Sequence, residues 1–156
     1  MEGSKTSYAQ FKKWEGGTDS GLSFDFRTRS SDGLLLYTDD PSTCDSLEIK
    51  LVGGRVRLRV NTGAGPGVIE SSQQLASLSD DAWHSVSVLK RGANTTLVVD
   101  SDLQSLTCHT DNPGHLVLGN MSHNHYVYVG GLPSWYHSKL KVGTTLHFTS
   151  LHVRTV

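Results

Sequence analysis

Three arginines at alternate positions are the most prominent residues of this chain that could bind a ligand. Arg55, Arg57 and Arg59 are separated by apolar residues, so an extended strand would place all three guanidinium groups on one face, with Lys50 beside them across a hairpin. Guanidinium groups hold sulfate through paired hydrogen bonds, so this basic strip predicts a site for a sulfated glycosaminoglycan such as heparan sulfate. The alternative, which we favour, is the solvated outer face of a sheet.

Zinc at a pair of histidines is a second chemistry that the spacing allows. His123 and His125 would lie on one side of an extended segment, but no cysteine or carboxylate follows at a ligand spacing, so we expect ordinary loop histidines.

For the adjacent Trp83 and His84 we expect a core tryptophan and a half-exposed histidine rather than a catalytic pair. Residues 63–67 are rich in glycine but lack the helix and the Lys-Ser/Thr of a phosphate loop, so they predict a turn.

Paired carboxylates of a glycan-cleaving enzyme would need to face one cleft. Asp45 and Glu48 are three residues apart and would point to opposite faces of a strand, and the adjacent Asp39 and Asp40 diverge in the same way. The chain also has no G-x-S-x-G elbow and no C-x-x-C motif. We therefore predict a binding module and not an enzyme, although distant residues that converge in space would escape this test.

Two cysteines and two glycan acceptor motifs are relevant to whether the protein is secreted or remains in the cytosol. Cys44 and Cys108 either form a disulfide or remain reduced, and the sequence leaves both alternatives open. Asn94 and Asn120 each begin an N-x-S/T motif, which predicts N-glycosylation in a secreted protein and otherwise marks ordinary turn asparagines.

Length and composition predict one domain over residues 1–156. The formal net charge of −1 gives no indication of binding to nucleic acid or membranes. No stretch approaches the roughly 18 apolar residues that span a bilayer. Met1 is followed by polar residues and not by a secretory signal, so we expect either an excised fragment of a secreted protein or a cytosolic protein.

Alternation of apolar and polar residues predicts the elements that must position these side chains. The pattern recurs in several short runs at residues 22–26, 46–51, 55–60, 86–88 and 126–129. Turn residues separate the runs at 31–33, 53–54, 91–94 and 130–133. Near Thr149 and Ser150 the apolar residues switch from even to odd positions, which predicts a bulge. Residues 77–82 could form one helical turn at most. The chain therefore predicts an all-β, two-sheet jelly-roll sandwich.

Five of these segments resemble the laminin G (LNS) domain family, in the order that the family has them. They are residues 23–28, 32–37, 45–49, the D-D-A-W-H-S-V run at 80–86, and the Y-V-G-G-L-P strand end at 128–133. Further matches at residues 11–14, 37–40, 44–48 and 94–97 are similar to the first such domain of the neurexins. Residues 15–18 lack the cysteines that this domain usually carries, and residues 148–151 lack the glycine of the family's last strand. The resemblance implies a jelly roll of about fourteen strands.

The resemblance also implies a calcium site at the rim of the sandwich. Carried over position by position, its ligands are the carboxylate of Asp45, the carbonyl of Thr62, and Asn120 with Ser122. One carboxylate with carbonyls predicts weak binding, with a dissociation constant of roughly 10⁻⁴–10⁻³ M. The alternatives are that Asp45 only begins a strand and faces water, or that a glycan on Asn120 excludes the metal.

As to function, the resemblance implies an extracellular adhesion module from the ectodomain of a presynaptic cell-surface membrane protein. It would bind postsynaptic or other extracellular adhesion proteins through rim loops and a sheet edge, with no membrane insertion of its own. Trp135 and Tyr136 are candidate anchors, because aromatic residues dominate interface hot spots, or else they pack a loop onto the sandwich. The alternative function is a lectin-like module of a matrix protein that binds glycosaminoglycan, and a glycan-cleaving enzyme is a distant third.

Overall fold

The computed structural model describes residues 8–12, 19–40, 45–61, 66–107, 126–133 and 148–155, with the backbone alone for strand residues 19, 20, 40, 45 and 148–155. These residues form eleven strands, and none of them is helical. No helix in this part of the chain is long and apolar enough to cross a membrane. The resemblance implied about fourteen strands, and the described residues contain eleven.

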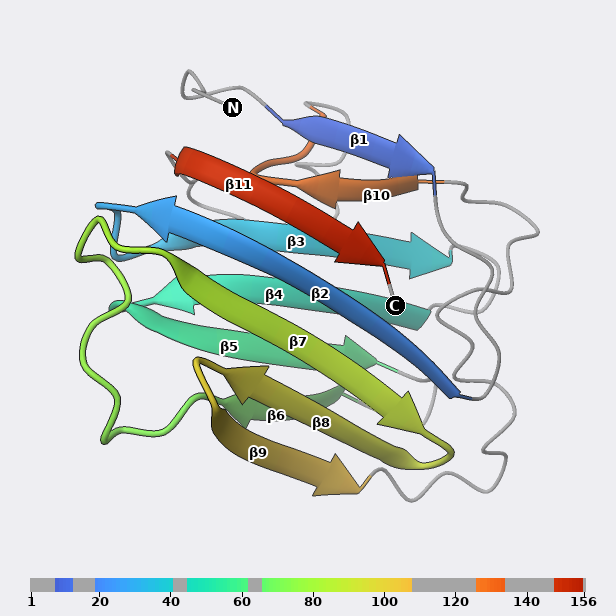
Figure 1. Ribbon diagram of the computed structural model, residues 1–156. Coiled ribbons are helices and arrows are strands. Elements are labelled where there is room, and N and C mark those ends of the chain that lie inside the picture. Colours follow the sequence, from blue (N-terminus) through green and yellow to red (C-terminus); the bar gives the residue numbers. More distant parts are fainter. Residues whose placement is uncertain are drawn as a thin grey trace.

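The strands form two antiparallel sheets packed face to face (Figure 1). The six-stranded sheet has the order β1 (Ala9–Lys12), β10 (Tyr126–Val129), β3 (Gly33–Asp40), β4 (Asp45–Val52), β5 (Arg55–Asn61) and β6 (Pro66–Glu70). The five-stranded sheet has the order β11 (Phe148–Thr155), β2 (Asp19–Thr28), β7 (His84–Arg91), β8 (Asn94–Val99) and β9 (Asp102–Thr107). The predicted all-β sandwich is confirmed.

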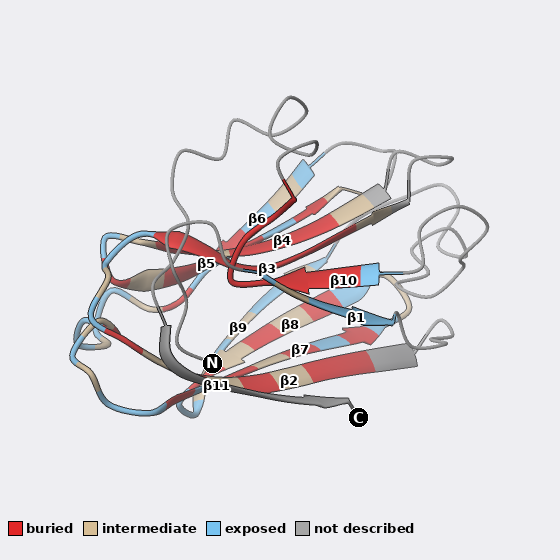
Figure 2. Ribbon diagram, turned by 90° about the horizontal axis from the view of Figure 1, so that it is seen from above, coloured by how far each residue is buried: buried red, intermediate tan, exposed pale blue. Residues whose placement is uncertain are grey.

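The core lies between the two sheets, where the buried segments of both face each other (Figure 2). Leu22, Phe24 and Phe26 of β2 point inward and are at most 1% exposed, as the alternation predicted. They pack with inward residues of both sheets, including Ile49 of β4 and Val86 of β7. Period-two patterning thus supplies one buried face per strand, and the sandwich closes over those faces.

Two-residue turns connect neighbouring strands where the sequence predicted hairpins. Gly53 and Gly54 join β4 to β5 with φ angles of +57° and +75°, the left-handed pair that a tight turn between twisted strands requires. Gly54 is also crowded, because an added Cβ atom would meet the side chain of Ser77. Gly92 and Ala93 form the two-residue turn between β7 and β8, in which only Gly92 has a positive φ angle, of +55°.

Two bulges change which face the side chains occupy. The register between β11 and β2 shifts between Phe148 and Ser150, which confirms the predicted bulge. A second shift in β3, between Leu34 and Leu36, was not predicted. It places Leu34 opposite the outward Lys50, in a small outer cluster with Tyr37, Tyr128 and Leu132, while Leu35 and Leu36 join the main core. All three consecutive leucines are thereby buried.

Replacement of Phe26 tests the dependence of the sandwich on its inner face. We expect Phe26→Ala, at a side chain that is 0% exposed, to lower the free energy of unfolding by about 3–5 kcal/mol, through lost burial and the cavity left behind. The matched control is Leu103→Ala on the outer face of β9, where the side chain is 62% exposed and the loss should stay below about 1 kcal/mol. Urea denaturation measures both, and equal losses would contradict this account of the core.

Candidate functional site

The rim predicted to hold calcium is described in its backbone alone. Asp45 is the first residue of β4 and lies opposite Asp40 of β3. On the other side of β4, the adjacent residue Ser46 pairs with Asn61 at the end of β5. The start of β4 and the end of β5 therefore meet at one end of the six-stranded sheet (Figure 1). In the described part of the chain, no three histidine, cysteine or acidic side chains are grouped so that they could hold a metal ion.

Several predicted site residues lie outside the described residues. They are Cys44, Thr62, Cys108, Asn120, Ser122, His123, His125, Trp135 and Tyr136. Asn94, the other glycan acceptor, is described: it is the exposed first residue of β8, and its Oδ1 atom accepts a hydrogen bond of 2.8 Å from the hydroxyl of Thr107.

The basic strip lies on one outer face, as predicted, and Lys50 stands opposite Arg57. Acidic neighbours share that face. Arg57 forms an ion pair with Glu70 on β6, and Lys50 lies 2.9 Å from Glu48. These pairs favour the interpretation of the strip as a solvated, internally paired face, because acidic partners compete with sulfate for the same donors.

The Trp83–His84 pair has the opposite exposure to the one expected from the sequence. Trp83 is 45% exposed, whereas His84 is only 8% exposed. His84 begins β7 with its side chain on the inner face, where its ring lies 5.6 Å from that of Phe26. Trp83 precedes the strand on the outer side, so the expectation of a core tryptophan and a half-exposed histidine is wrong.

Two carboxylates hold the buried imidazole. The Nδ1 atom of His84 lies 2.6 Å from Asp100, and its Nε2 atom lies 2.9 Å from Asp80. Backbone amides fix both acids, because Ser85 donates to Asp100 at 2.8 Å and Ala82 donates to Asp80 at 2.8 Å. The Asp80–His84–Asp100 network thus joins the segment before β7 to the turn between β8 and β9. No local sequence pattern indicates this network, because Asp100 is sixteen residues from His84.

Charge in the network is set by competition between burial and hydrogen bonding. Burial lowers the pKa of His84, but the hydrogen bonds to Asp100 and Asp80, together with their charges, raise it above its ordinary value of 6.5. The pKa of Asp80 is lowered, first by the amide of Ala82 and then by His84. The imidazolium form of His84 is therefore favoured by its surroundings.

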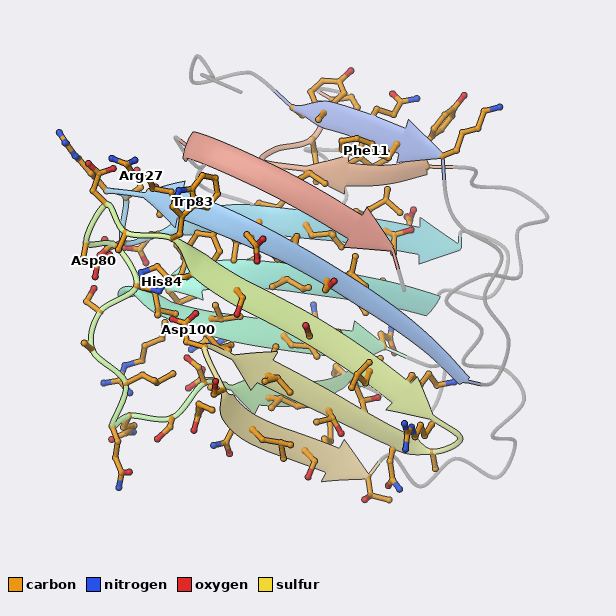
Figure 3. The ribbon with its side chains drawn as sticks, in the orientation of Figure 1. Phe11, Arg27, Asp80, Trp83, His84 and Asp100 are labelled. Carbon is orange, nitrogen blue, oxygen red and sulfur yellow. The ribbon has the colours of Figure 1, made fainter. Side chains whose placement is uncertain are left out.

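An open pocket of about 220 Å³ lies beside the network, lined by Asp25, Trp83, His84, Ser85 and Asp100. Figure 3 shows Trp83, His84, Asp80 and Asp100 gathered where β7 begins, with Arg27 of β2 close by. Arg27 lies 3.1 Å and Arg29 lies 2.7 Å from Asp81.

The contacts of His84 leave its ring unsuited to acid–base catalysis. Both ring nitrogens of His84 are engaged by carboxylates, so the imidazole has no nitrogen left to activate a hydroxyl such as that of Ser85. An exposed indole beside carboxylates, on rigid backbone, can instead receive part of a ligand.

The chain is similar in sequence and in fold to known proteins. A family model of the laminin G domain matches residues 26–149. Neurexin 1 of Drosophila melanogaster is 40% identical over 140 residues, which is 90% of this chain and 7% of that protein. Neurexin-2 of Homo sapiens is 34% identical over 133 residues, 84% of this chain and 7% of that protein. The chain thus spans only a small part of these relatives. Among solved structures, domains LG4-5 of the mouse laminin alpha1 chain share the fold with a TM-score of 0.75 at 23% identity, covering 97% of this chain and 40% of that one.

The raised pKa of His84 predicts how stability changes with pH. A histidine that binds its proton more tightly in the folded state stabilises the fold fully below its unfolded pKa, and this contribution is lost as pH rises through the folded pKa. We expect the difference in free energy of unfolding between the wild type and His84→Gln to be largest below the ordinary pKa of 6.5 and to shrink as the pH rises above it.

Urea denaturation at pH values on both sides of that pKa measures the difference, and the subtraction cancels groups common to both proteins. Proton NMR gives the pKa directly, with the His84 signal assigned by its loss in the variant. A His84 pKa below 6.5, or a difference that grows with pH, would contradict the network as described.

Proposed function

Because the chain belongs to the laminin G domain family, we propose that it is an extracellular recognition module of a neurexin-like cell-surface protein, which binds other adhesion proteins. The observation that carries this proposal is the similarity to Drosophila neurexin 1, which extends over 90% of the chain. By that similarity the domain would sit in a presynaptic ectodomain and its partner would be a postsynaptic adhesion protein.

Binding without catalysis is supported by the chemistry of the described residues. The buried His84 is held on both nitrogens by aspartates, and its pocket presents an indole and carboxylates. A module of this kind acts through its surface, so the rigid sandwich serves to position loops and strand edges.

Partner contacts would use the rim loops and the edge strand β1. β1 pairs only with β10 among the described strands, so its other edge is open to a partner. Phe11 on β1 is 43% exposed, and Tyr8 and Tyr126, which lie on the opposite face of this sheet edge, are 38% and 37% exposed. Together with Trp135 and Tyr136, these aromatic residues are the anchors that we propose, because large flat side chains contribute most of the energy of protein interfaces.

Calcium would order the rim where β4 begins. The proposed ligands are the carboxylate of Asp45, the carbonyl of Thr62, and Asn120 with Ser122. These oxygen donors suit calcium, and a single carboxylate implies weak binding.

Covalent modification would complete an extracellular domain of this kind. Asn94 begins an acceptor motif on an exposed hairpin, where an attached glycan would project into solvent, and Asn120 is the second proposed acceptor. Cys44 directly precedes β4 and Cys108 directly follows β9, and we propose a disulfide between them.

A second candidate function is glycosaminoglycan binding through the basic strip. The observation that favours it is the common outer face of Arg55, Arg57 and Arg59. The ion pairs of Arg57 and Lys50 with acidic neighbours weigh against it, so protein recognition remains our first proposal.

Binding to cell surfaces separates the two functions. We expect the domain, fused to an antibody Fc region, to stain cultured neurons, and we expect the staining to disappear after surface proteolysis and to survive heparinase, because the proposed partner is a protein. A Phe11→Ala variant should stain less, and Val68→Ala, on the outer face of β6, is the matched control at an exposed apolar residue. Loss of staining after heparinase would favour the glycosaminoglycan, and absence of staining would contradict both functions.

Calorimetric titration tests the proposed calcium rim. We expect calcium to bind the wild type with a dissociation constant of roughly 10⁻⁴–10⁻³ M and to bind Asp45→Asn at least about tenfold more weakly, since the variant removes the one charged ligand. The control is Asp32→Asn, at the turn end of the β4–β5 hairpin, where Oδ1 accepts a hydrogen bond from Gly53 that an amide oxygen can also accept. No heat with the wild type, or equal affinities, would overturn the site.

A further inference from the structure

The pocket beside Trp83 lies on the outer face of the five-stranded sheet, away from the proposed calcium rim. Asp25 of β2 stands opposite Ser85 of β7 in the ladder, and Trp83 and Asp100 line the same pocket. The start of β7 and the start of β4 are at opposite ends of the sandwich (Figures 1 and 3). A ligand here would not touch the rim.

The charge around the pocket is negative. Asp25, Asp80 and Asp100 surround or adjoin His84, so these acids outnumber the imidazolium even when it is protonated. The nearby Arg27 and Arg29 are both ion-paired with Asp81. Each carboxylate oxygen can accept more than one hydrogen bond, so Asp100 retains acceptor capacity beyond its bonds to His84 and Ser85.

The indole of Trp83 gives the pocket an aromatic wall. It is 45% exposed beside a rigid network, so a ligand can reach it without unfolding any element. The face of an indole attracts cations through its quadrupole, and tryptophan is the strongest of the aromatic side chains in this respect.

Along β7, β8 and β9, several neighbouring positions of the outer sheet surface carry no charged side chain. Ser87 of β7 pairs with Val98 of β8, which in turn pairs with Leu103 of β9. Leu103 is 62% exposed and Leu89, on the same outer face, is 38% exposed. A partner could therefore place apolar residues here while a basic residue enters the pocket.

We propose that the Trp83–Asp100 pocket is a second recognition site, which binds a cationic side chain of a protein partner, an arginine guanidinium or a lysine ammonium. The cation lies against the indole of Trp83 and is neutralised by Asp100 and Asp25, and the partner's flanking apolar residues cover Leu89, Val98 and Leu103. This site goes beyond the proposed function, because it involves neither the rim loops nor calcium.

Matched small probes test the charge requirement on the intact domain. N-acetyl-arginine amide and N-acetyl-citrulline amide have nearly the same shape and differ in the charge of the end group. In ¹H–¹⁵N NMR titrations we expect the arginine probe to cause saturable shifts at the Trp83 indole and at the Ser85 amide, and the citrulline probe to bind at least about tenfold more weakly.

Two variants place the effect in the pocket. Trp83→Leu should weaken the arginine probe by about three- to thirtyfold, and Asp25→Asn, which leaves the His84 network intact, should weaken it as well. Val68→Ala, at an exposed apolar residue on the other sheet, is the control and should bind as the wild type does. If Trp83→Leu does not fold, Asp25→Asn still decides the matter.

The proposal is overturned if the wild type does not respond to the arginine probe, or if citrulline and arginine bind equally. It is also overturned if a neutral monosaccharide shifts the same signals while the cation does not, since the pocket would then be a sugar site. The test uses purified domain and small molecules, so its failure leaves the cell-surface result and the calcium titration unaffected.

Discussion

Each strand of this sandwich must bury one face, and that constraint decides which side chains are available for function. Leu22, Phe24 and Phe26 of β2 are buried in the core, so the alternate residues Asp25 and Arg27 point outward. The same rule applied to β5 gives the basic strip. The two outer surfaces differ in consequence: acidic and basic residues pair across β4, β5 and β6, whereas the outer face of β7, β8 and β9 is largely uncharged. Recognition chemistry therefore concentrates where strands begin and end.

His84 is one of the polar residues that are buried despite this constraint, as Lys90 of the same strand is, and it shapes the end of the sandwich at which it lies. Its position in β7 directs a polar ring toward Phe26, and a buried imidazole is tolerated only when both nitrogens have partners. Asp80 and Asp100 supply them. Asp100 and Ser101 adopt positive φ angles of +48° and +80° in the β8–β9 turn, and the bonds from Asp100 to His84 and Ser85 hold that turn in place. The same arrangement leaves Trp83 outside the core.

Local pattern predicted most of the fold, because alternation and turn residues act over a few positions. The core face of β2, the Gly53–Gly54 hairpin, the bulge near Ser150 and the shared face of the three arginines all follow from such short-range rules. The bulge in β3 could not be read in this way, since three successive leucines carry no alternation to mark it. The exposure of Trp83 depends on which residue begins β7 and on an acid far along the chain, and neither is encoded nearby. The proposed calcium ligands follow from the family resemblance and not from these short-range rules.

The two ends of the molecule would therefore recognise ligands by different physical means. The proposed calcium rim draws its oxygens from segments that follow or precede several strands, so an ion would be needed to hold them together, and its occupancy would follow the calcium concentration. The Trp83–Asp100 pocket is built on a network whose hydrogen bonds are already made, so binding there requires little ordering of the protein. A module with one ion-dependent end and one preorganised end can keep hold of one partner while contact with another is regulated, because the two sites share no residue.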